Sequence, residues 1–275
     1  RDHLGAQDCT IALKSAYKEE IASLEVAILA LGSKVKLHTM NSFYPAGDEQ
    51  VIVCEVTGKV VPPSGIPLDV GCVVSNVATV CAINDALNNI PFTHKYLTVT
   101  GEVGEPTVLH VPLGTSFSEC LEAAGGTHLD EYFVICGGPM MGKPMTMEEA
   151  AKAVVTKTTS GYIILPPDGR LPSLYKTPVE HTLNRAKSAC IQCSFCTQLC
   201  PRHMLGHPIE PNKIMRKLSC GSIEDMLDDP TVVNALLCCE CGVCELYACP
   251  MQLQPRKVNS LVKKALAQKG VKYQK

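Results

Sequence analysis

The sequence predicts a chain of three parts: a partial α/β layer, a small α+β module and a mainly helical C-terminal domain. Two observations support this prediction. The hydrophobic pattern changes its period along the first 180 residues, and ten of the sixteen cysteines fall between residues 190 and 249. With 275 residues, 46% of them hydrophobic, the chain has enough apolar material for two or three small cores, which excludes a largely disordered chain. We place the divisions at residues 1–92, 93–168 and 169–275.

The first part, residues 1–92, alternates helical and extended patterns. Apolar side chains at steps of 4, 3, 4 and 3 from Tyr17 to Leu31 predict an amphipathic helix that ends at Gly32. Residues 35–40 predict a strand and residues 76–87 another helix. This alternation is typical of an α/β layer but is too short to close one. Because a helix is an unusual first element of such a layer, we expect at least one strand to be missing upstream.

The second part, residues 93–168, has the β-branched content of strands around one short helix. Two strands, a helix and further strands in about 75 residues indicate a small α+β module. Its glycine-rich segment at residues 137–142 precedes no clear helix, so we interpret it as a structural turn rather than a phosphate loop. No G-x-G-x-x-G motif occurs in the chain. The expected strands are residues 96–100, 107–111, 131–136 and 162–165, and the expected helix is residues 115–124.

Charge and hydropathy exclude several classes of protein. The formal net charge of −2 argues against a general nucleic-acid binder. The charge is nevertheless divided, because residues 181–275 carry 13 Lys and Arg against 7 Asp and Glu. No apolar run approaches the roughly 20 residues of a transmembrane segment. The chain starts at Arg1 with neither an initiator Met nor a signal-peptide pattern, so we expect a fragment or a processed form.

The first cysteine run lies in residues 190–201 and reads C-x2-C-x2-C-x3-C-P. This is the spacing of a bacterial two-cluster ferredoxin, in which three thiolates in a tight loop bind one [4Fe–4S] cluster. The proline then turns the chain, so that the fourth thiolate points elsewhere. One C-x2-C pair would also suit zinc or a redox dithiol, but four cysteines that end in Cys-Pro are far more specific.

The second run, residues 238–250, reads C-x2-C-x2-C-x4-C-P and repeats the pattern with one extra residue. Two such runs predict two [4Fe–4S] clusters, with paired zinc sites as the alternative. In two-cluster ferredoxins the fourth cysteine of each run binds the other cluster. We therefore assign the ligands of the first cluster as Cys190, Cys193, Cys196 and Cys249, and those of the second as Cys238, Cys241, Cys244 and Cys200.

The roles of the remaining cysteines and of two histidines are less clearly indicated by the sequence. Cys238 already fits the spacing, so we expect its neighbour Cys239 to point away from the cluster, and Cys220 likewise to be no ligand. The six cysteines before residue 180 show no metal spacing, and we expect them to be small buried hydrophobes. His203 and His207 follow the first run; either they tune a cluster or touch an electron acceptor, or they cap and pack a turn.

Several short motifs join the two cysteine runs as marks of a family. They are residues 43–50, 62–67, 75–79, 137–142 and 154–159. Together with the order of the parts, they resemble the RnfC-like family, and within it the PduS-type cobalamin reductases of propanediol-utilisation microcompartments. The resemblance covers nearly the whole chain, and residues 201–216 and 238–245 are most similar to the microcompartment enzymes.

The resemblance implies a fold and a set of cofactors. The first part is similar to the flavin subunit of respiratory complex I, a Rossmann-like layer, and the second to a β-grasp (SLBB) domain. The third is a mainly helical ferredoxin domain. By this match FMN and two [4Fe–4S] clusters are the cofactors, NADH is the electron donor, and the flavin-pocket residues are Gly47, Asp48, Glu49, Asn76 and Thr79.

The chain departs from the family at two points. Nothing matches the glycine-rich loop that cradles the flavin phosphate, because the chain begins after the expected place of that loop. Ala78 stands where many relatives carry an acid, which loosens the expected pocket.

Three functions compete on this basis. The first is NADH-dependent reduction of cobalamin in a bacterial microcompartment of the cytoplasm, with a corrinoid, an adenosyltransferase and shell or lumen proteins as partners. The second is an RnfC-like subunit that passes electrons between NADH and ferredoxin or recycles NAD. The third is an electron-relay module without activity of its own.

Overall fold

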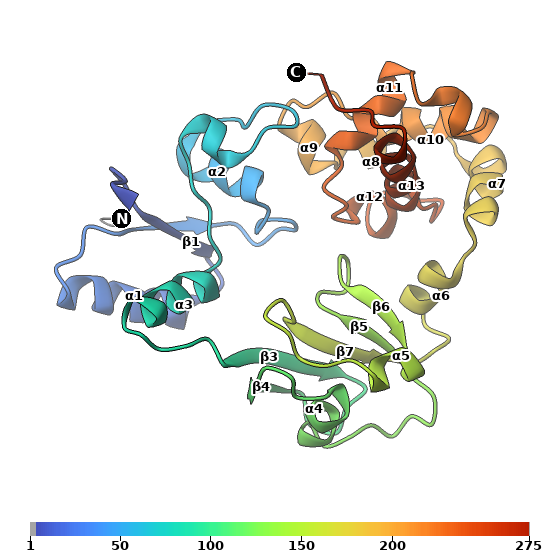
Figure 1. Cartoon of the computed structure of the whole chain (residues 1–275). Helices are drawn as coiled ribbons and strands as arrows, with labels where there is room; N and C mark the ends of the chain where they lie inside the picture. The colour runs from blue at the N-terminus through green and yellow to red at the C-terminus, as the bar shows by residue number, and fades with distance from the viewer. Residues whose placement is uncertain (1–3, 275) are drawn as a thin grey trace.

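The computed structural model describes residues 4–274 and has three groups of elements, drawn in Figure 1 as blue, green and orange regions. In the first group, strands β1 (Thr10–Lys14) and β2 (Lys36–Met40) pair in parallel, and helix α1 (Lys18–Ala30) connects them. The helix and the second strand were predicted. A strand was expected before this helix but upstream of the sequence, whereas β1 lies within it. The five side chains of β1 are all only half-buried and leave no alternating pattern.

The rest of the first group is helical. Helix α2 (Glu49–Thr57) contributes two buried side chains, Val51 and Val53, and ends at Gly58, whose φ of 70° is the left-handed conformation of a helix C-terminus. A 3-10 turn, η2 (Pro67–Val70), and helix α3 (Val77–Leu87) follow. Neither α1 nor α3 contains a fully buried residue. The apolar faces of these two helices are therefore largely uncovered within residues 4–274.

The second group is a five-stranded sheet of order β4-β3-β7-β5-β6. Its central pair, β3 and β7, is parallel and the other pairs are antiparallel. Phe117 and Tyr162 meet edge to face at 5.0 Å in its core. The four-residue strand β6 and the helix after it were not predicted, since four residues with a central proline carry little strand signal. The elements are β3 (His94–Gly101), β4 (Thr107–Pro112), α4 (Phe117–Ala123), β5 (Phe133–Cys136), β6 (Lys143–Thr146), α5 (Met147–Ala151) and β7 (Gly161–Leu165).

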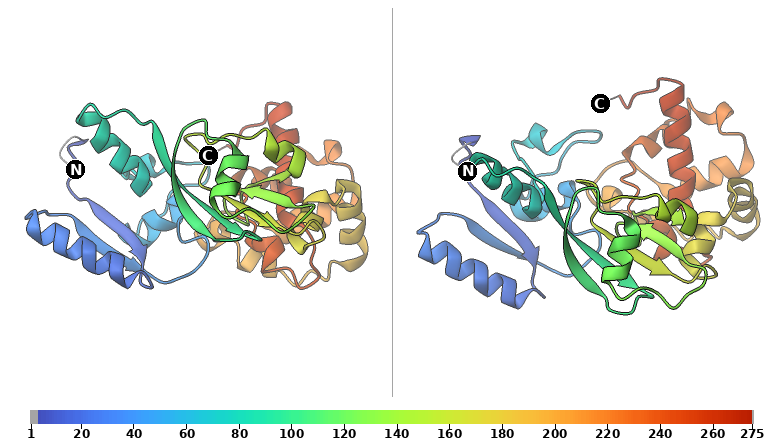
Figure 2. Two further views of the ribbon diagram at one scale, coloured as in Figure 1. Left: turned by 90° about the horizontal axis from the view of Figure 1, so that it is seen from below. Right: turned by 60° about the horizontal axis from the view of Figure 1, so that its bottom comes forward.

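The third group is helical, and both cysteine runs lie in it (Figure 2). Helices α10 and α13 form its centre, with Ile214, Leu218, Val258 and Val262 fully buried between them. No helix in the described part of the chain is long and apolar enough to cross a membrane. Its elements are α6 (Arg170–Lys176), α7 (Val179–Ala189), α8 (Phe195–Gln198), α9 (Pro201–Met204), α10 (Pro211–Cys220), η3 (Glu224–Met226), α11 (Pro230–Val233), η4 (Asn234–Leu237), α12 (Val243–Leu246) and α13 (Pro255–Gln268).

A pair of glycines tests the packing between strands β3 and β7. Gly101 and Gly114 have nearly the same φ, 97° and 94°. A Cβ on Gly101 would lie 2.1 Å from the carbonyl oxygen of Ile164, whereas one on Gly114 would meet nothing within 4 Å. We expect Gly101→Ala to lose roughly 1–3 kcal/mol more unfolding free energy than Gly114→Ala, the usual cost of overpacking. Urea unfolding of both variants measures the difference, and equal losses would contradict this packing.

Candidate metal centres

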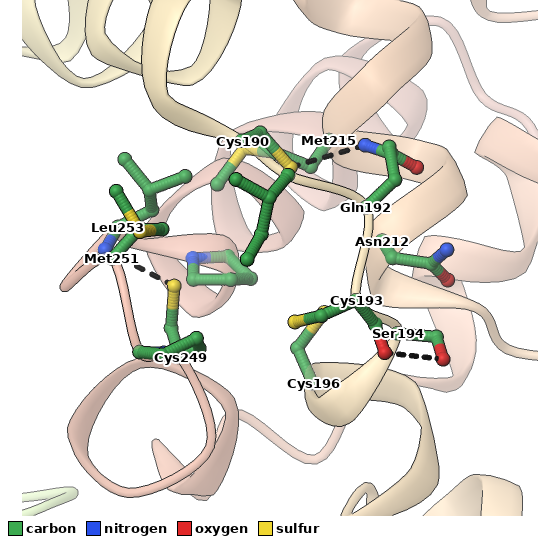
Figure 3. Close-up of a pocket in the computed structure, with 13 residues that line it drawn as sticks. Cys190, Gln192, Cys193, Ser194, Cys196, Asn212, Met215, Cys249, Met251 and Leu253 are labelled. Atoms are coloured by element: carbon green, nitrogen blue, oxygen red, sulfur yellow. Dashed lines mark hydrogen bonds between the residues drawn. The ribbon is translucent and has the colours of Figure 1, made fainter.

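Four cysteines from both runs line one cavity of the helical domain. Cys190, Cys193 and Cys196 come from the first run and Cys249 from the end of the second. Figure 3 shows Cys193 and Cys196 at the start of α8, with Cys190 and Cys249 across the same space. Apolar side chains complete the wall, among them Ile191, Met215, Met251 and Leu253. The structure thus brings together the four residues assigned to the first cluster.

A second cavity is lined by the four cysteines assigned to the second cluster. Cys238, Cys241 and Cys244 of the second run lie around it together with Cys200, the last cysteine of the first run. Cys239 also lines this cavity, so the expectation that it points away is wrong. The residue that follows it, Glu240, is left-handed, with φ of 57°.

The two runs share one backbone conformation. The residue before the second cysteine is left-handed in both, with φ of 54° at Gln192 and 57° at Glu240. The residue after that cysteine is also left-handed, with φ of 61° at Ser194 and 84° at Gly242, and a short helix follows in each case. Left-handed backbone at a residue other than glycine is uncommon and marks functional loops. The repeated spacing therefore reflects a repeated loop.

Amide N–H groups point at the sulfur atoms of three of these cysteines. The Gln192 side-chain amide donates to Cys190 Sγ at 3.0 Å, and the backbone amide of Leu253 donates to Cys249 Sγ at 3.3 Å. The backbone amide of Glu240 donates to Cys238 Sγ at 3.4 Å. Burial raises the pKa of the Cys196 thiol to about 12 and that of Cys238 to about 11. These thiols therefore need a bound cation to ionise, as metal-ligating cysteines do.

Asn259 is a polar residue of the second cavity that sequence reasoning missed. It lies on the buried face of α13 with 1% of its surface exposed, and it lines the cavity. Neither its amide nitrogen nor its oxygen makes a hydrogen bond within the described residues, and the amide lies near the Cys238 thiol. An unpaired buried amide is costly unless something in the cavity accepts its hydrogen bond. Thiolate and sulfide sulfur atoms of a cluster are such acceptors, so the donor set fits an iron–sulfur group.

A single-ion geometry is not present. Within residues 4–274 no three His, Cys, Asp or Glu side chains converge closely enough to hold one metal ion. The cysteines instead surround two cavities.

The second cavity lies where all three groups meet. The Tyr44 hydroxyl donates to the carbonyl oxygen of Cys241 at 2.9 Å, and burial raises the pKa of Tyr44 to about 12. From the sheet domain, the turn at residues 137–142 places Met140 against Cys241, and Arg256 Nη1 donates to the Met140 carbonyl at 2.8 Å. The glycine-rich segment is therefore the turn between β5 and β6, as expected, and it also packs against the second run.

The flavin-pocket candidates lie at helix N-termini. Asp48 caps α2, accepting hydrogen bonds from the amides of Gln50 and Val51, and Asn76 caps α3. The Asp48 carboxylate is also bound by both terminal nitrogens of Arg202, so it is not free for a ligand. The other candidates are exposed, and their role toward a flavin stays a prediction; they are Gly47, Glu49, Asn76 and Thr79.

The two histidines make local and interdomain contacts. His203 Nδ1 lies 3.0 Å from the Ile209 carbonyl oxygen within its own turn. His207 is buried, and its Nε2 donates to the Val61 carbonyl of the first group at 2.8 Å. The packing interpretation is therefore the one that the geometry supports for both.

The isolated cysteines are less buried than expected. Only Cys120 of the six before residue 180 is buried, and Cys81 is exposed. The expectation of six small buried hydrophobes is wrong: in the first group the helices are poorly covered, and in the second Cys136 is half-buried at the end of β5. Cys220 is exposed and lines neither cavity.

Comparison with known families assigns each part. Residues 1–85 match the Nuo51 FMN-binding domain, residues 96–144 the SLBB domain, and residues 189–254 the 4Fe-4S dicluster domain. The predicted FMN and [4Fe–4S] cofactors are thereby confirmed at the level of domains.

Two groups of curated relatives are similar in sequence. The chain is 38% identical over 271 residues to the cobalamin reductase PduS of Citrobacter freundii, an alignment that covers 98% of this chain and 58% of the relative. It is 33% identical over 176 residues to a component of the proton-translocating ferredoxin:NAD(+) oxidoreductase complex of Clostridium ljungdahlii, covering 63% of this chain and 35% of that component. The chain thus spans somewhat more than half the length of its PduS relatives.

A solved structure has the same fold. The crystal structure of the NAD+-reducing [NiFe]-hydrogenase in the H2-reduced state superposes with a TM-score of 0.54. The match covers 98% of this chain and 50% of that chain at 18% identity, so the likeness concerns the fold.

The fold and the two cavities define a chain with an FMN-binding domain, an SLBB domain and a 4Fe-4S dicluster domain. The chain is an RnfC-like homologue of the cobalamin reductase PduS.

The buried contact of His207 gives a pH prediction. Burial lowers the pKa of His207, and Arg202 lowers it further, while the hydrogen bond to Val61 and Asp48 oppose the shift. The unfolded chain takes up a proton near pH 6.5, but the folded chain resists it to lower pH, so stability should fall as pH drops below about 6.5.

His207→Gln keeps a donor for Val61 but does not titrate, which makes it the matched control. Anaerobic urea unfolding at pH 7.5 and 5.5 should show a larger loss for the natural chain than for the variant. Both hold the same clusters, so acid damage to clusters cancels in the comparison. Equal losses would contradict the role of His207.

Proposed function

We propose that this chain belongs to an NADH-dependent reductase in which electrons pass from FMN through two [4Fe–4S] clusters to a corrinoid. The observation that carries the proposal is the pair of four-cysteine cavities, the second of which adjoins the FMN-binding domain. Such an arrangement suits conversion of a two-electron donor into single electrons. Support for the corrinoid as acceptor comes from PduS, whose alignment covers 98% of this chain.

The chain's own residues do three things in this proposal. Four thiolates hold each cluster: Cys190, Cys193, Cys196 and Cys249 the first, and Cys238, Cys241, Cys244 and Cys200 the second. Apolar walls such as Met215 and Leu253 limit access of water to the first. Amide donors such as those of Gln192 and Asn259 face the sulfur atoms, and such donors raise cluster potentials.

The partners and location belong to the same proposal. We infer a corrinoid or an adenosyltransferase as the recipient of the electrons, and a bacterial microcompartment as the setting, because the similarity to PduS extends over 98% of this chain. The second candidate function is RnfC-like transfer between NADH and ferredoxin. The Clostridium ljungdahlii relative favours it, but over 63% of the chain only.

The crossed ligand assignment predicts paired losses. Two [4Fe–4S] clusters require about eight iron atoms per chain. Cys249→Ala should halve the iron and remove the same electron paramagnetic resonance (EPR) signal as Cys196→Ala, although the two residues belong to different runs. Cys200→Ala should likewise match Cys244→Ala. Cys220→Ala, an exposed cysteine outside both cavities, is the control and should keep all the iron.

The opposite pairing, with Cys249→Ala matching Cys244→Ala, would overturn the crossed assignment. Stoichiometric zinc in place of iron would overturn the clusters themselves.

Reduction by NADH tests the electron path. We expect anaerobically reconstituted protein with FMN to lose the broad visible absorbance of its clusters when NADH is added, to the extent that dithionite produces. The reduced protein should then convert cob(III)alamin to cob(II)alamin. Bleaching by dithionite alone would favour the relay function, and oxidation by ferredoxin but not by cobalamin would favour the RnfC-like one.

A further inference from the structure

A buried ion pair joins the FMN-binding domain to the cluster domain. Arg202 Nη1 donates to Asp48 Oδ1 at 2.5 Å and Nη2 donates to Oδ2 at 2.9 Å, a bidentate geometry across 154 positions of sequence. The two side chains are only 10% and 15% exposed. Salt screens buried charges poorly, so removing either charge of the pair changes the electrostatic potential around it.

Arg202 lies against the second cavity. It follows Cys200 and Pro201, which both line that cavity, and its backbone amide faces the Cys200 sulfur. Its guanidinium group is also near the thiol of Cys239, which lines the same wall. The lining of the first cavity, by contrast, includes no Lys, Arg, Asp or Glu among residues 4–274.

We propose that Arg202 and Asp48 are positioning residues that set the reduction potential of the second cluster, with Arg202 raising it and Asp48, brought by the FMN-binding domain, lowering it. The inference rests on the proposed cluster at Cys238, Cys241, Cys244 and Cys200. A cluster gains one negative charge on reduction, so a nearby cation favours the reduced form and an anion opposes it. Docking of the FMN-binding domain therefore neutralises a cation that the cluster domain alone would leave unpaired.

The test is an EPR-monitored redox titration of the reconstituted chain. Asp48→Asn keeps the helix cap and a hydrogen bond to Arg202 but removes the negative charge. It should favour reduction of the second cluster at least threefold, a rise of about 30 mV at 59 mV per tenfold. Arg202→Gln should shift the potential downward by a similar amount. The double variant should return near the natural value, and the first cluster should keep its potential throughout.

His207→Gln at pH 8 is the control, because it alters the same interface without changing charge. If the pair had only a structural role, both variants would shift the potential of the second cluster in the same direction, or the potentials of both clusters would shift together. Either of those results, or unchanged potentials, would overturn the inference. A natural chain that holds only about four iron atoms and lacks the second EPR signal would instead overturn the proposed second cluster. The two failures are therefore distinguishable.

Discussion

The crossing of cysteines between the two cavities is the constraint on which the helical domain depends. Cys249 lies with the first run and Cys200 with the second, so neither cavity is complete until the chain between residues 201 and 237 has folded. The core formed by α10 and α13 holds the two runs at this separation. A side-by-side pair of cavities follows from it, which is the arrangement that electron transfer between two clusters requires.

The two cavities differ in their surroundings. The first is walled by side chains of the cluster domain alone, and Ile191 in that wall is 64% exposed. The second is covered from outside its own domain, by Tyr44 of the FMN-binding domain and by Met140 of the SLBB domain. In the proposed electron path, this asymmetry places the second cavity next to the FMN-binding domain and leaves the wall at Ile191 as the approach for an acceptor to the first.

Features that depend on residue spacing along the chain could be predicted from the sequence. The crossed cysteine sets, the three parts and most long elements follow from ligand spacing and hydrophobic period. Asn259 had one usable signal, a polar residue between Val258 and Val262 on an apolar face. The Asp48–Arg202 pair had none, because its partners are 154 positions apart. Asp48 was assigned to a flavin by resemblance, whereas its carboxylate binds Arg202. Strand β1 and the inward course of Cys239 depend on tertiary packing and on backbone conformation that no periodicity encodes.

Two arginines, the buried Arg202 and the half-buried Arg256, lie beside the second cavity, and they are neutralised differently. Arg256 lies in the cavity wall and pairs at 2.7 Å with Glu245, a buried carboxylate of the same domain. That charge is balanced as soon as the cluster domain folds. The charge of Arg202 is balanced by Asp48, which belongs to the FMN-binding domain. Since removing one partner of a buried pair leaves an uncompensated charge, the environment of the second cavity is complete only in the assembled chain. The FMN-binding domain is thus an electrostatic part of the second metal centre as well as its neighbour.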